Sequence, residues 1–284
     1  MALKIENGKI VGTIDNLEDK LNGEIQVTRE ELLVLVNSWG RAQSFYIFDI
    51  NQDIDIEECK AKECYDLSKL DTSGITNMDD VFIYSLFEGD ISQWNTSNVT
   101  SMNSMFNETT KFNGDIGNWD VSNVTSMYYM FGYTDNYNQP LNNWNTSNLI
   151  NMEAMFCGAE SFNQDISNWD ISNVTSMFKM FANTKVFNQN ISKWNLDNIK
   201  NCDYILDNTK AFEIKYNNNK SIPYKTKEIK EWIINNRDKM NDIDIKEKYG
   251  KEVDGFFSNI TDIYSTNRIG LHENLLTECN KLCL

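Results

Sequence analysis

A block of 25 residues repeats along the middle of this chain, and five full copies follow one another without an insertion or deletion. Tryptophan marks each copy, and aliphatic, methionine and aromatic residues keep the same spacing around it. The aligned rows are Trp94, Trp119, Trp144, Trp169 and Trp194; Val99, Val124, Leu149, Val174 and Ile199; Met102, Met127, Met152, Met177 and Cys202; Phe106, Phe131, Phe156, Phe181 and Leu206; and Phe112, Tyr137, Phe162, Phe187 and Phe212. A unit this short cannot bury its own apolar side, so stacking is expected to align these residues in continuous ladders.

Within a unit, the spaced apolar residues and the Asn that follows them suggest a short strand. Ile116, Trp119 and Val121 are expected to point inward from a strand of a parallel sheet. The asparagine row is expected to cap the strand ends and to satisfy turn backbone from unit to unit. The row is Asn98, Asn123, Asn148, Asn173 and Asn198. The M-x-x-M-F run that follows has helical spacing, which predicts one helical or 3₁₀ turn.

Two segments carry a resemblance to a known family. FNGDIGNWDVSNVTSMYYMF and FNQDISNWDISNVTSMFKMF resemble the BspA-like leucine-rich-repeat surface proteins, and more narrowly their lipoprotein-associated repeat of about 25 residues. The resemblance covers about residues 66–212 and implies a solenoid binding protein without shared catalytic residues. The N-terminus shows neither a leader nor a lipid-attachment cysteine, which leaves surface display in doubt.

The resulting fold prediction is an α/β solenoid, a leucine-rich-repeat-like stack of about six 25-residue units with parallel strands. An α+β cap is expected at residues 1–65, the repeat at 66–212, and a helical cap or partner-binding module at 213–284. Asn7-Gly8 predicts a hairpin turn, and Thr28 with Glu31 forms the sequence pattern of a helix capping box.

Further elements are expected on both flanks of the repeat. Gly40 is expected to end the capped helix, and SFYIFDI (44–50) is expected to form a strand. Helical periodicity in the C-terminal region places Ile229, Trp232 and Ile233 on one face. A second such face is expected near the end of the chain, at Leu271, Leu275, Leu276, Cys279 and Leu282.

Charge and cysteine content narrow the functional classes. The net charge is −16, and residues 70–212 hold 16 acidic against 6 basic residues. This balance argues against binding to a nucleic-acid backbone, which needs clustered Lys and Arg. The six cysteines lack the paired spacing of a zinc site, so free thiols are expected, with Cys202 as a small buried apolar residue.

No motif for catalysis or for a cofactor stands out. The single histidine, His272, has no evident partner for a catalytic triad. The acidic run from Asp49 has Ile54 and Lys60 where a calcium loop needs Gly and Glu, so a solvated strand edge is favoured. We therefore expect a protein that is not an enzyme and that has no cofactor and no metal site.

The outward residues are the candidates for contact with a protein partner. Polar side chains between the inward positions are expected to line a concave sheet face, and tyrosines break the repeat pattern in one unit. The candidates are Asn95, Asp120, Ser122, Asn145, Asp170, Asn195, Tyr128, Tyr129 and Tyr133. The predicted function is a non-enzymatic protein-binding repeat protein, such as a subunit, inhibitor or immunity-type factor.

Two alternative functions remain open at this point. One is a bacterial surface adhesin without its leader, and the other is an acidic mimic of nucleic acid. No apolar run is long enough to span a membrane. A chain without a signal peptide is expected in the cytoplasm, with the cell surface as the alternative. The sequence does not indicate an oligomeric state.

Overall fold

The computed structural model describes residues 4–6, 9–11, 14–37 and 64–244. The chain forms two compact units, residues 1–237 and 238–284, and all the elements below belong to the first. β1 (Lys4–Glu6) pairs antiparallel with β2 (Lys9–Val11), and Glu6 lies opposite Lys9. This pairing confirms the predicted hairpin of the two strands, and the turn residues Asn7 and Gly8 lie outside the described residues.

Two short helices precede the repeat, α1 (Leu17–Leu21) and α2 (Arg29–Asn37). The predicted capping box is present at the start of α2. The Thr28 N–H donates to Glu31 Oε2 at 2.9 Å, and the Glu31 N–H donates to Thr28 Oγ1 at 3.2 Å. The same Glu31 oxygen lies 2.9 Å from Lys20 Nζ in a nearly buried ion pair, which ties α1 to α2.

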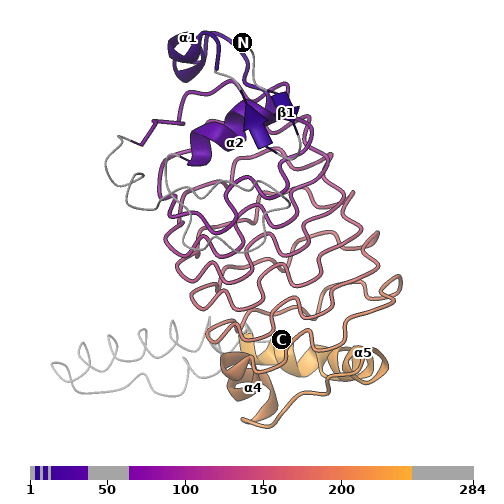
Figure 1. Ribbon diagram of the computed structural model, residues 1–284. Coiled ribbons are helices and arrows are strands. Elements are labelled where there is room, and N and C mark those ends of the chain that lie inside the picture. Colours follow the sequence, from indigo (N-terminus) through magenta and orange to yellow (C-terminus); the bar gives the residue numbers. More distant parts are fainter. Residues whose placement is uncertain (1–3, 7–8, 12–13, 38–63, 245–284) are drawn as a thin grey trace, which may run out of the picture. The chain divides into compact units, whose positions relative to one another are not determined.

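The repeat units form a stack of coils, seen between α2 and α4 in Figure 1, with no strand among them. Each coil forms a single parallel β-bridge with the next, too short to make a strand. The bridges are Asn77–Ser101, Ser101–Ser126, Ser126–Asn151, Asn151–Ser176 and Ser176–Asn201. Across the described residues the only two strands are β1 and β2. The predicted α/β solenoid with parallel strands is therefore wrong, and the leucine-rich-repeat frame is not supported.

Alternating hydrogen bonds explain why the coils contain turns in place of strands. In the coil that contains Trp94, every second N–H group donates to a carbonyl of the same coil. These donors are Met105, Asn107 and Thr109. The alternate N–H groups donate to carbonyls of the next coil, at 2.7 to 3.1 Å. These donors are Met102, Ser104, Phe106 and Glu108. An extended strand directs all its N–H groups to neighbouring strands, so this alternation closes a turn at every second residue.

The M-x-x-M-F run is not helical either. The second residue after the first methionine, or its equivalent, has a positive φ in every coil, at Ser104, Tyr129, Ala154, Lys179 and Tyr204. A right-handed helix or 3₁₀ turn requires a negative φ at this position. The predicted helical turn is therefore wrong, and the run forms successive tight turns.

Aromatic ladders fill the interior of the coil stack. Phe106 and Phe131 lie with ring centroids 5.6 Å apart and nearly parallel, and Trp94 stacks on Trp119 at 6.2 Å. The closing aromatic row runs alongside, with Phe106 only 4.2 Å from Phe112. Ile116, Trp119 and Val121 are buried, so their inward direction was correctly predicted although no strand holds them.

Polar side chains bond the coils to one another at the same spacing. Each tryptophan donates its indole N–H to a carbonyl of the preceding coil, as Trp119 does to Ile91 at 3.0 Å. The asparagine row does the same at the surface, where Asn123 Nδ2 donates to the Ser97 carbonyl at 2.7 Å. Bonding from unit to unit by this row is confirmed, and it takes place at turns.

Tyr137 is an exception within the closing aromatic row. Its ring stacks on Phe112 at 5.7 Å and on Phe162 at 6.4 Å, but its buried hydroxyl has no partner among the described residues. Burial, with a smaller effect of Asp115, raises the pKa of this hydroxyl well above its usual value.

Replacing Tyr137 with Phe is expected to raise the free energy of unfolding by about 1–2 kcal/mol, because it removes an unsatisfied buried hydroxyl. Urea denaturation measures the change, and Phe162→Tyr is the matched opposite variant, expected to destabilise. A loss of stability in Tyr137→Phe would show that the hydroxyl has a partner.

Both ends of the coil stack are covered. At the first coil, the Val27 N–H donates to the Asp71 carbonyl at 3.0 Å, and Arg29 Nη2 donates to the Asp79 carbonyl at 2.6 Å. At the other end lie α4 (Lys210–Asn217), which starts within the segment expected to be repeat, and α5 (Thr226–Asn235). In α5, Ile229 and Ile233 are buried as predicted and Trp232 is half-buried.

Several predictions fall outside the described residues. These are the helix stop at Gly40, the strand at 44–50, the acidic run from Asp49 to Lys60, Cys59, His272, and the helical face at 271–282 with Cys279 and Cys283. Cys157 and Cys202 are buried free thiols, as expected for Cys202 in a methionine row. None of the described helices is long and apolar enough to cross a membrane.

Candidate interaction surface

Exposed tyrosines gather in the coil of Trp119. The exposed fractions of Tyr128 and Tyr133 are 40% and 42%. Tyr129, which lies between them in the sequence, is half-buried. The rings of Tyr128 and Tyr129 meet edge to face, with centroids 4.8 Å apart. Tyr128, Tyr129 and Tyr133 are called the tyrosine patch below.

Small residues in this coil and the following ones leave room for the tyrosine rings. Tyr129 packs against a buried cluster of Ala154, Cys157 and Ala182. A Cβ atom added to Gly158 would lie 2.4 Å from Cδ1 of Tyr133, and one added to Gly132 would lie 2.6 Å from Cδ1 of Tyr129. Such distances are sterically forbidden, so the two ring positions depend on glycine at both sites.

The backbone also directs these rings. Tyr129 and Tyr133 both have a φ of 53°, in the left-handed region that is uncommon for a tyrosine. The coil-to-coil hydrogen bonds hold this conformation, since the Tyr129 N–H reaches the Glu153 carbonyl at 2.9 Å and the Tyr133 N–H reaches the Cys157 carbonyl at 2.8 Å. The rings are thus held in position by the turns of the coil.

The phenol groups of Tyr129 and Tyr133 stay protonated near neutral pH. Burial raises the pKa of Tyr129 to about 12. The neighbouring Cys157 thiol and then burial raise the pKa of Tyr133, and Glu108 adds a smaller effect. Burial likewise raises the pKa of Cys157. Tyr129 and Tyr133 therefore offer uncharged phenol groups with hydroxyl donors.

The polar row predicted on a concave sheet lies on turns. Asn95, Asp120, Asn145, Asp170 and Asn195 are exposed, and each side-chain oxygen accepts the N–H of the residue two positions on, at 2.9 to 3.2 Å. The hydroxyl of half-buried Ser122, and then its N–H, lower the pKa of Asp120. These groups stabilise local turns.

The polar row and the tyrosine patch occupy different turns of the coil. Within one coil, Asp120 and Ser122 precede buried Val124, whereas Tyr128 follows buried Met127. Among the described residues, no hydrogen bond or ring contact joins the two sets. The tyrosines, and not the polar row, therefore form the stronger candidate for a contact surface.

A second aromatic group lies at the C-terminal end of the same face. Phe178 and Tyr204 meet edge to face at 6.1 Å, and Tyr204 stacks on Tyr224 at 5.2 Å. Lysines cover these rings. Lys179 Nζ lies 5.2 Å from the Phe178 centroid and 5.9 Å from that of Tyr204, and Lys225 Nζ lies 5.4 Å from the Tyr204 centroid.

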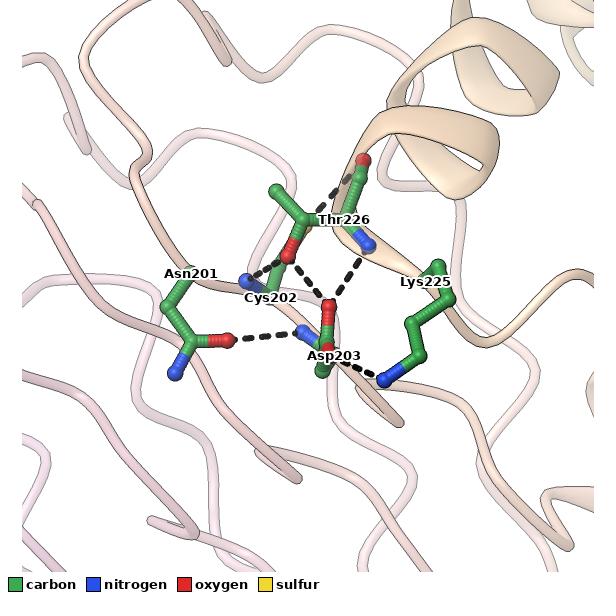
Figure 2. Close-up of polar contacts among 5 residues, drawn as sticks. All are labelled: Asn201, Cys202, Asp203, Lys225 and Thr226. Atoms are coloured by element: carbon green, nitrogen blue, oxygen red, sulfur yellow. Dashed lines mark hydrogen bonds and ion pairs between the residues drawn. The ribbon is translucent and has the colours of Figure 1, made fainter.

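Asp203 joins the last coil to the start of α5 (Figure 2). Its Oδ1 accepts the Thr226 N–H at 2.7 Å and the Thr226 hydroxyl at 2.6 Å, and its Oδ2 lies 2.9 Å from Lys225 Nζ. The Thr226 hydroxyl oxygen in turn accepts the Cys202 N–H at 2.9 Å. This joint could not be predicted from the sequence alone, although Asn103 Oδ1 accepts hydrogen bonds from Ser126 and Tyr128 of the next coil in a similar manner.

The described residues hold no group of three or more His, Cys, Asp or Glu side chains that could bind a metal ion. The predictions of no catalytic site and no cofactor remain predictions, and His272 lies outside the described part of the chain.

Comparison with known proteins identifies one family. The sequence model described as "Mycoplasma protein of unknown function, DUF285" matches residues 52–159 and again residues 119–221, together more than half of the chain. No curated protein and no solved structure matches the chain. Assignment to the BspA-like leucine-rich-repeat family is therefore wrong, because the matching family is a different one.

Proposed function

Since the chain belongs to the DUF285 family, whose description assigns no function, we propose that it is a non-enzymatic protein-binding protein. The tyrosine patch is its contact surface for a partner. The observation that carries the proposal is the exposure of Tyr128 and Tyr133, whose equivalents in the two adjoining coils are polar or small: Asn103 and Glu153 for Tyr128, and Glu108 and Gly158 for Tyr133.

Preorganisation supports this use of the patch. Tyrosine is enriched at the energetic centres of protein interfaces, where it contributes a large contact area together with a hydroxyl donor. The rings of Tyr129 and Tyr133 are seated over Gly132 and Gly158, so little side-chain entropy remains to be lost on binding. A coil stack held by ladders of identical contacts supplies the rigid base for such a surface.

The geometry gives less support to a nucleic-acid mimic. Such a mimic needs carboxylates repeated along one exposed face, but Asp120 and Asp170 alternate with asparagines in their row. Their carboxylates also accept hydrogen bonds from Ser122 and Ser172. The tyrosine patch has no role in that function.

Site-specific photo-crosslinking in cells that express the protein tests the proposal. Benzoylphenylalanine in place of Tyr133 is expected to give a discrete adduct with one protein. The same group at exposed Asn118, on the polar surface of the same coil, is the matched control and is expected to give none.

Competition makes the test specific. In lysate, excess unlabelled wild-type chain is expected to abolish the adduct, and an excess of the Y128L/Y133L variant is expected to leave it. Identical adducts from both labelled positions, or equal competition by the two chains, would contradict the proposal.

A further inference from the structure

We infer that the tyrosine patch accepts an arginine-bearing segment of the partner protein, with the guanidinium group stacked on the exposed rings. The inference rests on the proposed function and specifies its chemistry. It is drawn from the way this chain covers equivalent rings elsewhere on the same face, and from the charge around the patch.

The repeat provides an internal comparison. Phe178 occupies the position of Tyr128 two coils further on, and Tyr204 occupies the position of Tyr129 three coils further on. Lys179 covers Phe178 and Tyr204, and Lys225 covers Tyr204 and Tyr224, at 5.2 to 5.9 Å from the ring centroids. A cation within about 6 Å of a ring face is attracted by the ring quadrupole.

The tyrosine patch lacks this cover. Among the described residues, no lysine or arginine lies over the rings of Tyr128, Tyr129 or Tyr133, whereas five cation–π contacts are found on other rings of the chain. The two aromatic groups on this face therefore differ in their cations. The C-terminal rings carry their own cations, and the patch has rings open to a cation from outside.

Charge complementarity favours a cationic partner. Residues 70–212 carry 16 acidic and 6 basic side chains. Glu108 is close enough to act electrostatically on the Tyr133 hydroxyl. Lys179 also acts on Cys157 beneath the patch, but its ammonium is held over Phe178 and Tyr204. A negative field with open aromatic faces attracts a positively charged segment and disfavours an acidic one.

Arginine suits these rings better than lysine does. Its guanidinium is planar and weakly hydrated, and it stacks on an aromatic face while its N–H groups remain free to bond. The half-buried Glu108 carboxylate offers an acceptor for those N–H groups beside Tyr133. A single arginine side chain can in this way use both the ring and the acid.

Isothermal titration of the full chain with capped peptides tests the inference. One peptide carries three arginines separated by glycine, and its matched control carries citrulline, which keeps the planar group and loses the charge. The arginine peptide is expected to bind, and the citrulline peptide is expected to bind at least about five-fold more weakly.

Variants separate stacking from general attraction. Y128L/Y133L is expected to weaken the arginine peptide at least about five-fold, Y128F/Y133F to retain most of the binding, and D120N/D170N to change it less than about two-fold. Equal binding of the two peptides, equal loss in Y128L/Y133L and D120N/D170N, or no binding would overturn the inference. The Tyr133 crosslink separates this failure from that of the proposed function, because the adduct forms with any partner that covers the patch.

Discussion

Truncation of Trp119 to alanine is expected to lower the free energy of unfolding by about 3–5 kcal/mol, the range found for large aromatic side chains removed from a core. Trp119 is 3% exposed and stacks on Trp94 at 6.2 Å, with Phe106 at the same distance. Its loss opens a cavity between two coils and removes the stacking partner of Trp94. The Ile91 carbonyl also loses the indole N–H as a donor.

Trp119→Phe is the matched control, because Trp119 is one ring of a stacked row. Trp119→Phe keeps a ring in the row and loses only the N–H and part of the area, so a cost of about 1–2 kcal/mol is expected. Urea unfolding followed by circular dichroism measures both changes. A loss below about 1 kcal/mol in Trp119→Ala would show that the coils are held together mainly by their backbone hydrogen bonds.

The interior of the stack could be predicted from the sequence because identical spacing fixes which residues meet. Trp94 and Trp119 stand at the same position of consecutive units, so any regular stacking brings them together. The unit-to-unit hydrogen bonds of the asparagine row could be predicted for the same reason, since Asn123 reaches the preceding coil whether the coil contains strands or turns.

The backbone of the coil could not be predicted in the same way. Met102 and Met105 are three residues apart, a spacing that suits a helical turn and also a run of tight turns with two buried positions. The deciding feature is a positive φ at Ser104 and its equivalents, where Tyr, Ala, Lys and Tyr also stand. None of these residue types favours a left-handed conformation by itself. Hydrogen bonds to the neighbouring coils impose this conformation.

The candidate surface was predictable only in part. Tyr128, Tyr129 and Tyr133 could be predicted as contact candidates because aromatic side chains interrupt the repeat pattern there. The role of Gly158 and Ala154, which make room for the rings, could not be predicted, because a change to a smaller residue leaves the hydrophobic pattern intact. Their role depends on contacts between consecutive coils, so a single unit does not reveal it.

Replacement of Asp203 by alanine is expected to release the start of α5 from the last coil and to cost about 1.5–3 kcal/mol, the usual range for hydrogen bonds to a charged group. The carboxylate accepts both the N–H and the hydroxyl of Thr226, and it pairs with Lys225 (Figure 2). Hydrogen exchange is expected to speed up in residues 224–237 and to stay unchanged in the coil of Trp119. Asp120→Ala, which removes a carboxylate from a local turn, is the matched control and is expected to leave exchange in residues 224–237 unchanged.

The same joint is expected to weaken in acid. The Thr226 hydroxyl, the Lys225 ammonium and the Thr226 N–H lower the pKa of Asp203 from 3.8 to about 2. A carboxyl whose pKa is lower in the folded state adds stability that is complete above its unfolded value and is lost as the pH falls through the folded value. Between pH 4 and pH 2 the difference in stability between wild type and Asp203→Asn is therefore expected to shrink. A difference that stays constant over this range would mean that the charge of Asp203 does not hold the joint, and that the hydrogen-bond geometry alone does so.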